Sequence, residues 1–252
     1  EMVENLGHVD IRGADDVSLK LSKYSEFLYD NILLFCPQLD VFRGSVNVGD
    51  ILEFIDSGRN LLLVGGNAPG SVTSELASEV GFEFKESSTK RDYTNTKLND
   101  VYYIIGDKSK YSSPFSYSGT PMKMLNNELS LELLSNNAPV DDIRPSSSSK
   151  FITNVLIGAM QARNNARVVV AGSTDFFSDK AFELSKLENK HLTKELLAWL
   201  LKEKSLLRFS DVRHRKLNVD PAPSTDIATQ TRFEGYTIME DLEFKIKIEI
   251  YE

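Results

Sequence analysis

The stretch FITNVLIGAMQARNNARVVVAGSTDFFS, residues 151–178, decides the fold that we expect for this chain. It holds two apolar runs, Ile152–Met160 and Val168–Ala171, on either side of the polar segment Gln161–Arg167. The central pair of that segment is Asn164-Asn165, and asparagine tolerates the positive φ that a tight primed hairpin turn demands at both central positions. We therefore expect two adjacent antiparallel strands joined at this pair, with both asparagines at positive φ.

The second apolar run ends at Gly172, and we expect a helix after it. Ser173 or Asp175 can cap this helix, because their side-chain oxygens accept hydrogen bonds from the first backbone N–H groups. Asp175 could instead act as a general acid or a cation ligand, since it follows a strand end. We favour the cap, where its charge also suits the helix dipole.

Alternating strands and helices precede this stretch. Two continuous apolar runs, Asn31–Phe35 and Asn60–Val64, are expected of strands covered on both faces. Each is followed by a helical pattern, Val48–Asp56 and Val72–Val80, and short loops connect the four elements. This order predicts an α/β fold: a mostly parallel, doubly wound sheet of the glutamine-amidotransferase type with an antiparallel hairpin. A helix of about Leu192 to Lys204 closes the domain.

The C-terminal part has a different composition. Residues 211–235 are charged, then contain prolines, then are rich in threonine, which is typical of a linker. In Tyr236–Tyr251 apolar and charged residues alternate with the period of two of a half-buried strand. One strand is not a domain, so we expect residues 1–210 to form the α/β domain and residues 236–252 to begin a β-rich domain.

Composition excludes several classes of function. The net charge of −8 and the isoelectric point near 5.1 disfavour nucleic-acid binding, which usually leaves a basic footprint. Three histidines and one cysteine are poor material for a zinc site, and we predict no metal and no cofactor. The chain has no run of 18 apolar residues, so nothing in it is expected to span a bilayer.

Three places could carry chemistry, and they are Cys36, the loop Gly65–Gly70 and the arginines of the polar segment. Cys36 is the one thiol, but Phe35 and Pro37 flank it where a nucleophile elbow has glycines, so an amidotransferase-like enzyme is an alternative that we disfavour. The loop Gly65–Gly70 sits where a phosphate loop would, yet it lacks the GxGxxG and Lys-Ser/Thr patterns. We favour a structural turn there.

The arginines of the polar segment, Arg163 and Arg167, could grip an anion such as a pyrophosphate or pair with acidic residues of a neighbouring segment or chain. We favour the pairing. A free-standing glycan-binding module, with exposed aromatic rings in Tyr111–Tyr117 as its platform, is a second alternative function. No nucleophile, base and orienting group occur together, so we predict that the chain has no catalytic residues.

One segment gives a resemblance to a known family. QARNNARVVVAGSTDFFSD, residues 161–179, resembles the signature segment of the DDOST family, the non-catalytic lumenal subunit of the oligosaccharyltransferase complex. Three further pieces look alike in the same order, and they are Ala14-Asp15-Asp16 with the following Ser18-Leu19, Tyr24–Asn31 and Glu53–Gly58. The resemblance spans most of residues 5–210.

The resemblance implies a function. Members belong to the complex that transfers a preassembled glycan from dolichyl diphosphate to the Asn of Asn-x-Ser/Thr in nascent proteins, and the catalytic residues and metal lie in another subunit. It implies a scaffolding subunit whose partners are the other subunits, with Arg163, Asn164, Asn165, Arg167 and Asp175 as possible ligand or subunit contacts. Lipid-linked glycan or nascent chain are further possible partners.

The resemblance also implies a location. The family's precursors have a cleaved signal sequence and a single membrane anchor near the C-terminus, so this chain would be a lumenal fragment of a type I protein of the endoplasmic reticulum membrane. A strand and most of a helix precede residue 1 in the family, and we expect that first strand to be missing here.

Overall fold

The structure is a computed structural model, and its residues divide into two compact units, Glu1–Leu201 and Lys202–Glu252. The residues that it describes are 7–66, 68–85, 97–98, 101–104, 115–125, 128–138, 152–184, 187–216, 238–239 and 241–251.

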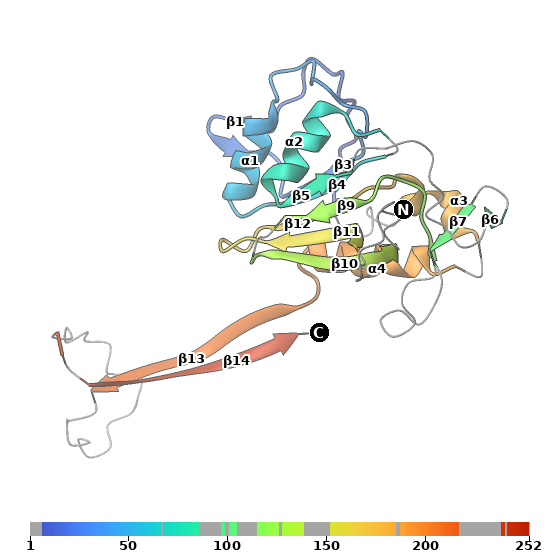
Figure 1. The fold of residues 1–252 in the computed structure, drawn as a ribbon. Helices are drawn as coiled ribbons and strands as arrows, with labels where there is room; N and C mark the ends of the chain where they lie inside the picture. The colour runs from blue at the N-terminus through green and yellow to red at the C-terminus, as the bar shows by residue number, and fades with distance from the viewer. Residues whose placement is uncertain are drawn as a thin grey trace, which may run out of the picture. The chain divides into compact units, whose positions relative to one another are not determined.

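The first unit is built on a seven-stranded sheet in the order β3-β4-β12-β11-β9-β5, with β10 beside β11 (Figure 1). The strands are β3 (Asn31–Leu34), β4 (Asn60–Val64), β5 (Phe82–Phe84), β9 (Met122–Met124), β10 (Ser130–Ala138), β11 (Ile152–Gln161) and β12 (Arg167–Ala171). Pairing is parallel between β3 and β4 and between β4 and β12, and antiparallel in every other described pair of this sheet. The prediction of a mostly parallel sheet is therefore wrong. The sequence analysis identified neither β9 nor β10, which both pair antiparallel with β11.

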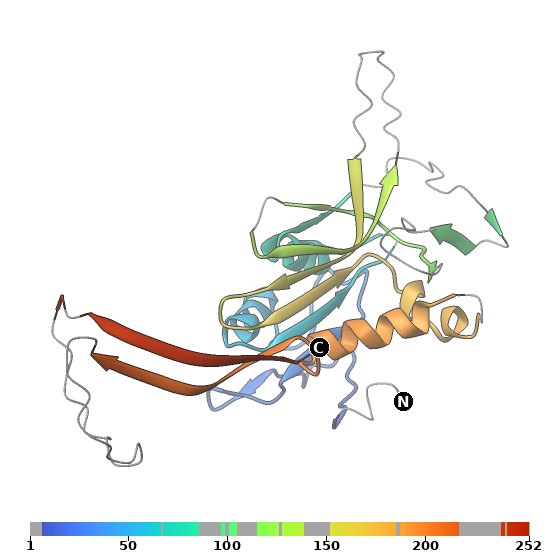
Figure 2. The ribbon, with the colours of Figure 1, turned by 90° about the horizontal axis from the view of Figure 1, so that it is seen from below.

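Helices cover both faces of the parallel strands. The helical segments are α1 (Val48–Asp56), α2 (Ser71–Glu79), a 3-10 turn η1 (Asp175–Phe177), α3 (Asp179–Phe182) and α4 (Asn189–Leu200). The helices α1 and α2 lie on one face and α4 on the other, as Figures 1 and 2 show from two directions. The helix α4 begins three residues before the predicted Leu192 and ends at Leu200 instead of Lys204.

The two central strands supply the core on both faces. All residues of β4 and β12 except Asn60 are at most 2% exposed. Alternate side chains enter two clusters: Leu61, Leu63, Val168 and Val170 pack on the α1 and α2 side, while Leu62, Val64, Val169 and Ala171 pack on the α4 side. This confirms the prediction for the run Asn60–Val64. The run Asn31–Phe35 instead gives the edge strand β3, in which only Leu34 is buried, and Phe35 beyond it is 46% exposed.

The helix α1 has the bounds expected from its sequence, and the reason is local. Asn47 accepts a hydrogen bond from the backbone N–H of Asp50, and the Asp50 carboxylate accepts one from the N–H of Asn47, which is a complete capping box. Ile51, Phe54 and Ile55 form its buried face. Gly58, with φ of 89°, follows its end.

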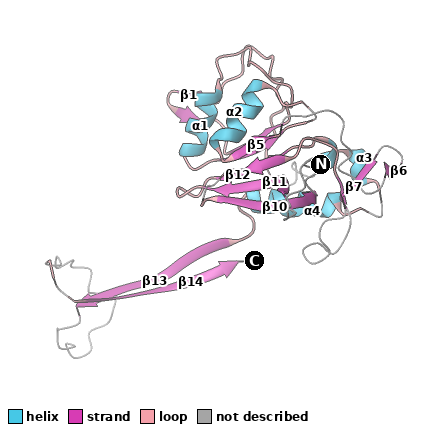
Figure 3. Ribbon diagram, viewed as in Figure 1, coloured by secondary structure: helices cyan, strands magenta, loops and turns pink. Residues whose placement is uncertain are grey.

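Five short strands lie outside this sheet, and Figure 3 separates strands from helices by colour. They are β1 (Ser22–Lys23), β2 (Glu26–Phe27), β6 (Lys97–Leu98), β7 (Val101–Ile104) and β8 (Phe115–Ser116). The antiparallel pair β1 and β2 is closed by Lys23 and Glu26, so Tyr24 and Ser25 form its two-residue turn.

The second unit contains a long antiparallel hairpin of β13 (Leu206–Lys216) and β14 (Leu242–Tyr251). The strand expected within Tyr236–Tyr251 thus exists and has a pairing partner. Residues 211–216, which we assigned to the linker, belong to β13 instead. A bulge of the G1 type explains why the strand pattern was hidden in the sequence: Asp211 and Val212 stand opposite one residue of β14, and Asp211 has φ of 52°, in the left-handed region. Among the helices of the described residues, none has the length and apolarity to cross a bilayer.

Candidate functional site

The carboxyl ends of β3, β4 and β12 meet at one edge of the sheet, and open α/β sheets bind ligands outside this edge. Cys36 follows β3, Gly65 and Gly66 follow β4, and Gly172 and Ser173 follow β12. The backbone N–H of Gly65 donates to the carbonyl of Ala171 at 2.7 Å, so β4 and β12 remain paired to their ends. This edge is the candidate site.

The phosphate position at the start of α2 is occupied by the chain itself. The backbone N–H of Ser71 donates to the Asp40 carboxylate at 2.8 Å, and the next N–H, of Val72, donates to the carbonyl of Leu39 at 3.1 Å. A Cβ on Gly70 would stand 2.3 Å from the Leu39 carbonyl oxygen, so the two backbones touch here. An internal carboxylate takes the place that a phosphate would take at a helix N-terminus, which supports the structural turn.

The segment Tyr117–Thr120 fills the edge next to β12. The backbone N–H of Thr120 donates to the carbonyl of Gly172 at 2.8 Å, and its hydroxyl donates to the carbonyl of Gly66 at 2.7 Å. The Ser173 hydroxyl donates to the carbonyl of Ser118 at 2.6 Å. These contacts join the ends of β4 and β12 to a segment that belongs to neither.

Glycines make this contact possible. A Cβ on Gly119 would lie 1.9 Å from the carbonyl oxygen of Gly172, and a Cβ on Gly172 would lie 1.8 Å from that of Thr120. Both distances are far shorter than a non-bonded contact between a carbon and an oxygen atom, so only glycine fits at either position without a shift of the backbone. The sequence analysis took Gly172 as the end of a strand and missed this use.

Tyr117 is the first residue of this segment and is 2% exposed. Its hydroxyl stands 3.0 Å from the carbonyl oxygen of Leu156 and 3.2 Å from that of Thr120, and burial raises its pKa. A buried ring cannot serve as a platform for a sugar. The glycan-binding alternative thereby loses Tyr117, while Tyr111 lies outside the described residues.

Asn189, which sequence reasoning missed, holds Ser116, the residue just before this segment. Its side chain is fully buried and pairs with the backbone of Ser116 as a neighbouring strand would: the amide oxygen accepts from the N–H at 2.8 Å and the amide nitrogen donates to the carbonyl at 2.8 Å. It also donates to the carbonyl of Phe176 at 3.1 Å. An asparagine in the first turn of a helix gives no sequence signal for this role.

The predicted contacts Arg163, Asn164 and Asn165 form the turn between β11 and β12. The N–H of Asn165 donates to the carbonyl of Ala162 and the N–H of Ala162 to that of Ala166, so the loop has three residues. Asn165 has φ of 69°, but Asn164 does not have positive φ. The expected two-residue primed turn is therefore wrong, because a three-residue loop needs only its last residue in the left-handed region.

Asn164 turns its side chain onto α1. Its amide nitrogen donates to the carbonyls of Ile55 at 3.0 Å and Asp56 at 2.8 Å, and its amide oxygen accepts from the N–H of Ala166 at 3.0 Å. The last carbonyls of a helix have no partner within the helix. Asn164 supplies a partner to Asp56 and a second one to Ile55, whose carbonyl also accepts from the N–H of Gly58. Arg163 is exposed.

Arg167 lies at the start of β12 and is 1% exposed. Its guanidinium donates to the carbonyl of Trp199 in α4 and lies over the Trp199 ring, 4.9 Å from the centroid. Burial lowers its pKa. The side chain thus fastens α4 to the sheet, a contact that neither of the sequence interpretations named.

Asp175 lies at the other end of β12 and is exposed, so the structure does not bring it together with the turn residues. It is the first residue of η1, and the Ser173 hydroxyl instead accepts the hydrogen bond of the Phe176 N–H at 3.2 Å. The N-cap position of η1 is Thr174, and the next helix, α3, is capped by Ser178, whose hydroxyl accepts from the N–H of Ala181. Neither predicted residue therefore occupies a cap position, although Ser173 bonds the first turn.

Cys36 is half-buried, and burial raises the pKa of its thiol. A nucleophilic cysteine needs the opposite shift, toward the thiolate. Elsewhere in the described ranges, His, Cys, Asp and Glu side chains do not gather in groups of three that could hold a metal ion. The contacts described at this edge are hydrogen bonds and close approaches between segments of the chain itself.

Comparisons with known proteins agree on one family. The family described as "OST48, N-terminal domain" matches residues 3–203. Proteins named "Dolichyl-diphosphooligosaccharide--protein glycosyltransferase 48 kDa subunit" match from Arabidopsis thaliana, at 30% identity over 97% of this chain and 61% of the relative. Those from Danio rerio and Drosophila melanogaster match at 32% and 31% identity, each over 94% of this chain and 59% of the relative.

The chain thus spans about three fifths of the length of these relatives. A solved structure described as "mmIFT52 N-terminal domain" matches with a TM-score of 0.45 at 17% identity, over 61% of this chain and 69% of that one.

Proposed function

Because the chain belongs to the family of the OST48 N-terminal domain, we propose that it is part of a non-catalytic, scaffolding subunit of the oligosaccharyltransferase complex. This complex transfers a preassembled glycan from dolichyl diphosphate to asparagine in nascent proteins. The resemblance recognised in the sequence is confirmed by the match over residues 3–203.

The observation that carries the non-catalytic part is the filled sheet edge. Asp40 occupies the phosphate position at α2, and Tyr117–Thr120 occupies the position beyond β4 and β12. The backbone contact between Gly119 and Gly172 leaves no room for a substrate there. The only thiol, Cys36, has a raised pKa, which opposes the amidotransferase-like alternative.

The proposal includes the setting of the subunit. We place it on the lumenal side of the endoplasmic reticulum membrane, anchored by a segment outside this chain, with the other subunits as partners, among them the catalytic one. The exposed residues Arg163, Asn165 and Asp175 stay candidates for subunit or glycan contacts, whereas Asn164 and Arg167 have internal roles. Helices on both faces of the parallel strands support a relation to doubly wound, amidotransferase-type sheets.

The test is co-purification. The full-length protein, tagged and expressed in cells that lack their own copy, is extracted in mild detergent, and the recovered proteins are identified and assayed for glycan transfer to an Asn-x-Thr peptide. We expect a multi-subunit complex with transfer activity, and no activity from the tagged subunit alone. Transfer by the isolated subunit, or its recovery without partners, would contradict the proposal.

A further inference from the structure

The turn between β1 and β2 keeps two residues in a conformation that favours glycine. Tyr24 has φ of 53° and Ser25 has φ of 65°. In this region the Cβ of an L residue crowds the following carbonyl oxygen, which is why such turns are usually built from Asn-Gly or Gly-Gly. Tyrosine is a costly residue at the first of these positions.

The ring of Tyr24 does not recover this cost by burial, because the residue is 90% exposed. The Lys23 ammonium lies 5.3 Å from the ring centroid, and Leu28, just beyond β2, is 51% exposed. Strained residues cluster at functional positions, and tyrosine is enriched among the residues that carry most of the binding energy in protein interfaces. The tip of this hairpin combines both features.

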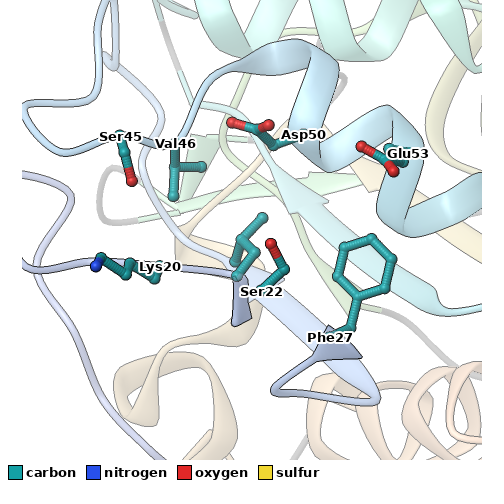
Figure 4. A pocket seen from close by; sticks show the side chains of 8 residues that line it. Lys20, Ser22, Phe27, Ser45, Val46, Asp50 and Glu53 are labelled. Carbon is teal, nitrogen blue, oxygen red and sulfur yellow. The ribbon is translucent and has the colours of Figure 1, made fainter. Parts of the chain in front are cut away.

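A hollow of about 100 Å³ lies beside the hairpin, and charged side chains line it (Figure 4). Ser22 and Phe27 of the hairpin line it together with Asp50 and Glu53 of α1. The hollow can hold the end of one long side chain. The lining has two carboxylates and one ammonium, that of Lys20, and this excess of negative charge favours a cationic group. The Asp50 carboxylate also accepts the capping hydrogen bond from the N–H of Asn47, so Glu53 is the main candidate partner.

We propose that the β1–β2 hairpin is a contact surface for another subunit of the same complex. Tyr24 inserts into a pocket of that subunit, and a lysine or arginine of the partner binds in the hollow beside Asp50 and Glu53. This inference rests on the proposed function, since it requires a complex around the chain. The strain at Tyr24 is then a loss of stability that is retained because it serves binding.

The test uses three variants of the full-length protein in cells that lack their own copy. Tyr24→Gly removes the ring and the strain together, Ser25→Gly removes strain only, and Tyr24→Phe keeps the ring. We expect Tyr24→Gly to weaken recovery of the other subunits about tenfold while the melting temperature of the purified chain does not fall. Ser25→Gly and Tyr24→Phe should recover wild-type amounts.

Normal recovery with Tyr24→Gly overturns the inference. A lower melting temperature for that variant also overturns it, because the tyrosine then serves folding. If the unaltered protein recovers no subunits, the proposed function fails instead, so the two failures are distinguishable.

Glu53→Gln tests the charged part of the contact separately. We expect it to weaken recovery and to reduce the effect of salt on association, because one screened ion pair is lost. Unchanged recovery and salt dependence would overturn the cationic partner.

Discussion

The side chain of Asn164 joins two elements that are 109 residues apart in sequence. An amide is the group that this position needs, since it donates two N–H bonds to the end of α1 and accepts one bond within its own loop. Asn164, whose residue type predicts a turn, therefore also caps the C-terminal end of α1.

Asn164→Asp should destabilise the chain, by about 1–3 kcal/mol of unfolding free energy. The carboxylate cannot donate to the carbonyls of Ile55 and Asp56, and its negative charge lies at the unfavourable end of the helix dipole. Chemical denaturation measures the change. Asn165→Gly is the matched control and should change stability little, because glycine accepts the φ of 69° at that position. Equal effects of the two substitutions would contradict the capping role.

Gly172→Ala should destabilise the chain by about 1–3 kcal/mol or more, since the new methyl group would collide with the carbonyl of Thr120. The measurement is the thermal unfolding temperature. Gly7→Ala is the control, because a Cβ there meets nothing within 4 Å. If Gly172→Ala unfolds at the temperature of the control, the segment Tyr117–Thr120 does not fill the sheet edge as described.

At the scale of elements, one asparagine aligns the starts of three parallel strands. The amide nitrogen of Asn60 in β4 donates to the side-chain oxygen of Asn31 in β3 at 2.7 Å, and its oxygen accepts from the backbone N–H of Arg167 in β12 at 3.0 Å. Register in a sheet is usually held by its hydrophobic pattern. The strands β4 and β12 are buried on both faces and carry no alternation, so a polar link at the strand starts adds the missing specificity.

The hairpin of β13 and β14 exposes large apolar side chains on one face of β14. Phe244 is 62% exposed and Ile248 is 59% exposed, and a two-stranded sheet is marginal by itself. We propose, as the alternation in the sequence suggested, that this hairpin begins a β-rich domain whose other strands cover its apolar face.

Replacing Phe244 and Ile248 by threonine tests this proposal. In the 252-residue chain the double variant should bind less hydrophobic dye with no loss of stability. In the full-length protein it should destabilise the second domain by about 3–5 kcal/mol, the usual cost of removing large core side chains. Lys245→Thr with Lys247→Thr, on the opposite face of β14, is the control and should be nearly neutral. A full-length protein that tolerates both pairs equally would contradict a covered apolar face.

At the scale of the whole molecule, the first unit closes the carboxyl edge of its parallel strands with its own chain. Backbone carbonyls and an aspartate satisfy the N–H groups that elsewhere meet a ligand.

The thiol of Cys36 gives this view a pH-dependent test. Because burial raises its pKa, less thiolate is present at a given pH than in the unfolded chain, and alkylation by iodoacetamide at pH 8 should be slower in the folded protein. The pH midpoint of the reaction should lie higher when folded than in denaturant, as followed by mass spectrometry. Faster alkylation of the folded chain at neutral pH would indicate an activated nucleophile. Cys36→Ser should leave glycan transfer by the assembled complex unchanged.

The sequence by itself determined the elements whose signals are local. The capping box of Asn47 and Asp50 and the apolar face behind it set the bounds of α1, and the continuous apolar runs identified β4 and β12. The polar loop between two apolar runs predicted the β11–β12 hairpin. Its turn type was not predicted, because the loop has three residues where we expected two. The family followed from the same segment.

Only the tertiary structure decided how the sheet edge is used. Ser116 and Asn189 are 73 residues apart, and the Thr120 hydroxyl meets the carbonyl of Gly66 across 54 residues. The segment Tyr117–Thr120 has no periodic pattern, because its hydrogen bonds go to the ends of other elements and not along a helix or strand of its own. A periodic sequence pattern arises when one face of a helix or strand packs against the same neighbour along its length. Contacts that each join a different pair of segments leave no such pattern, so only the folded structure shows them.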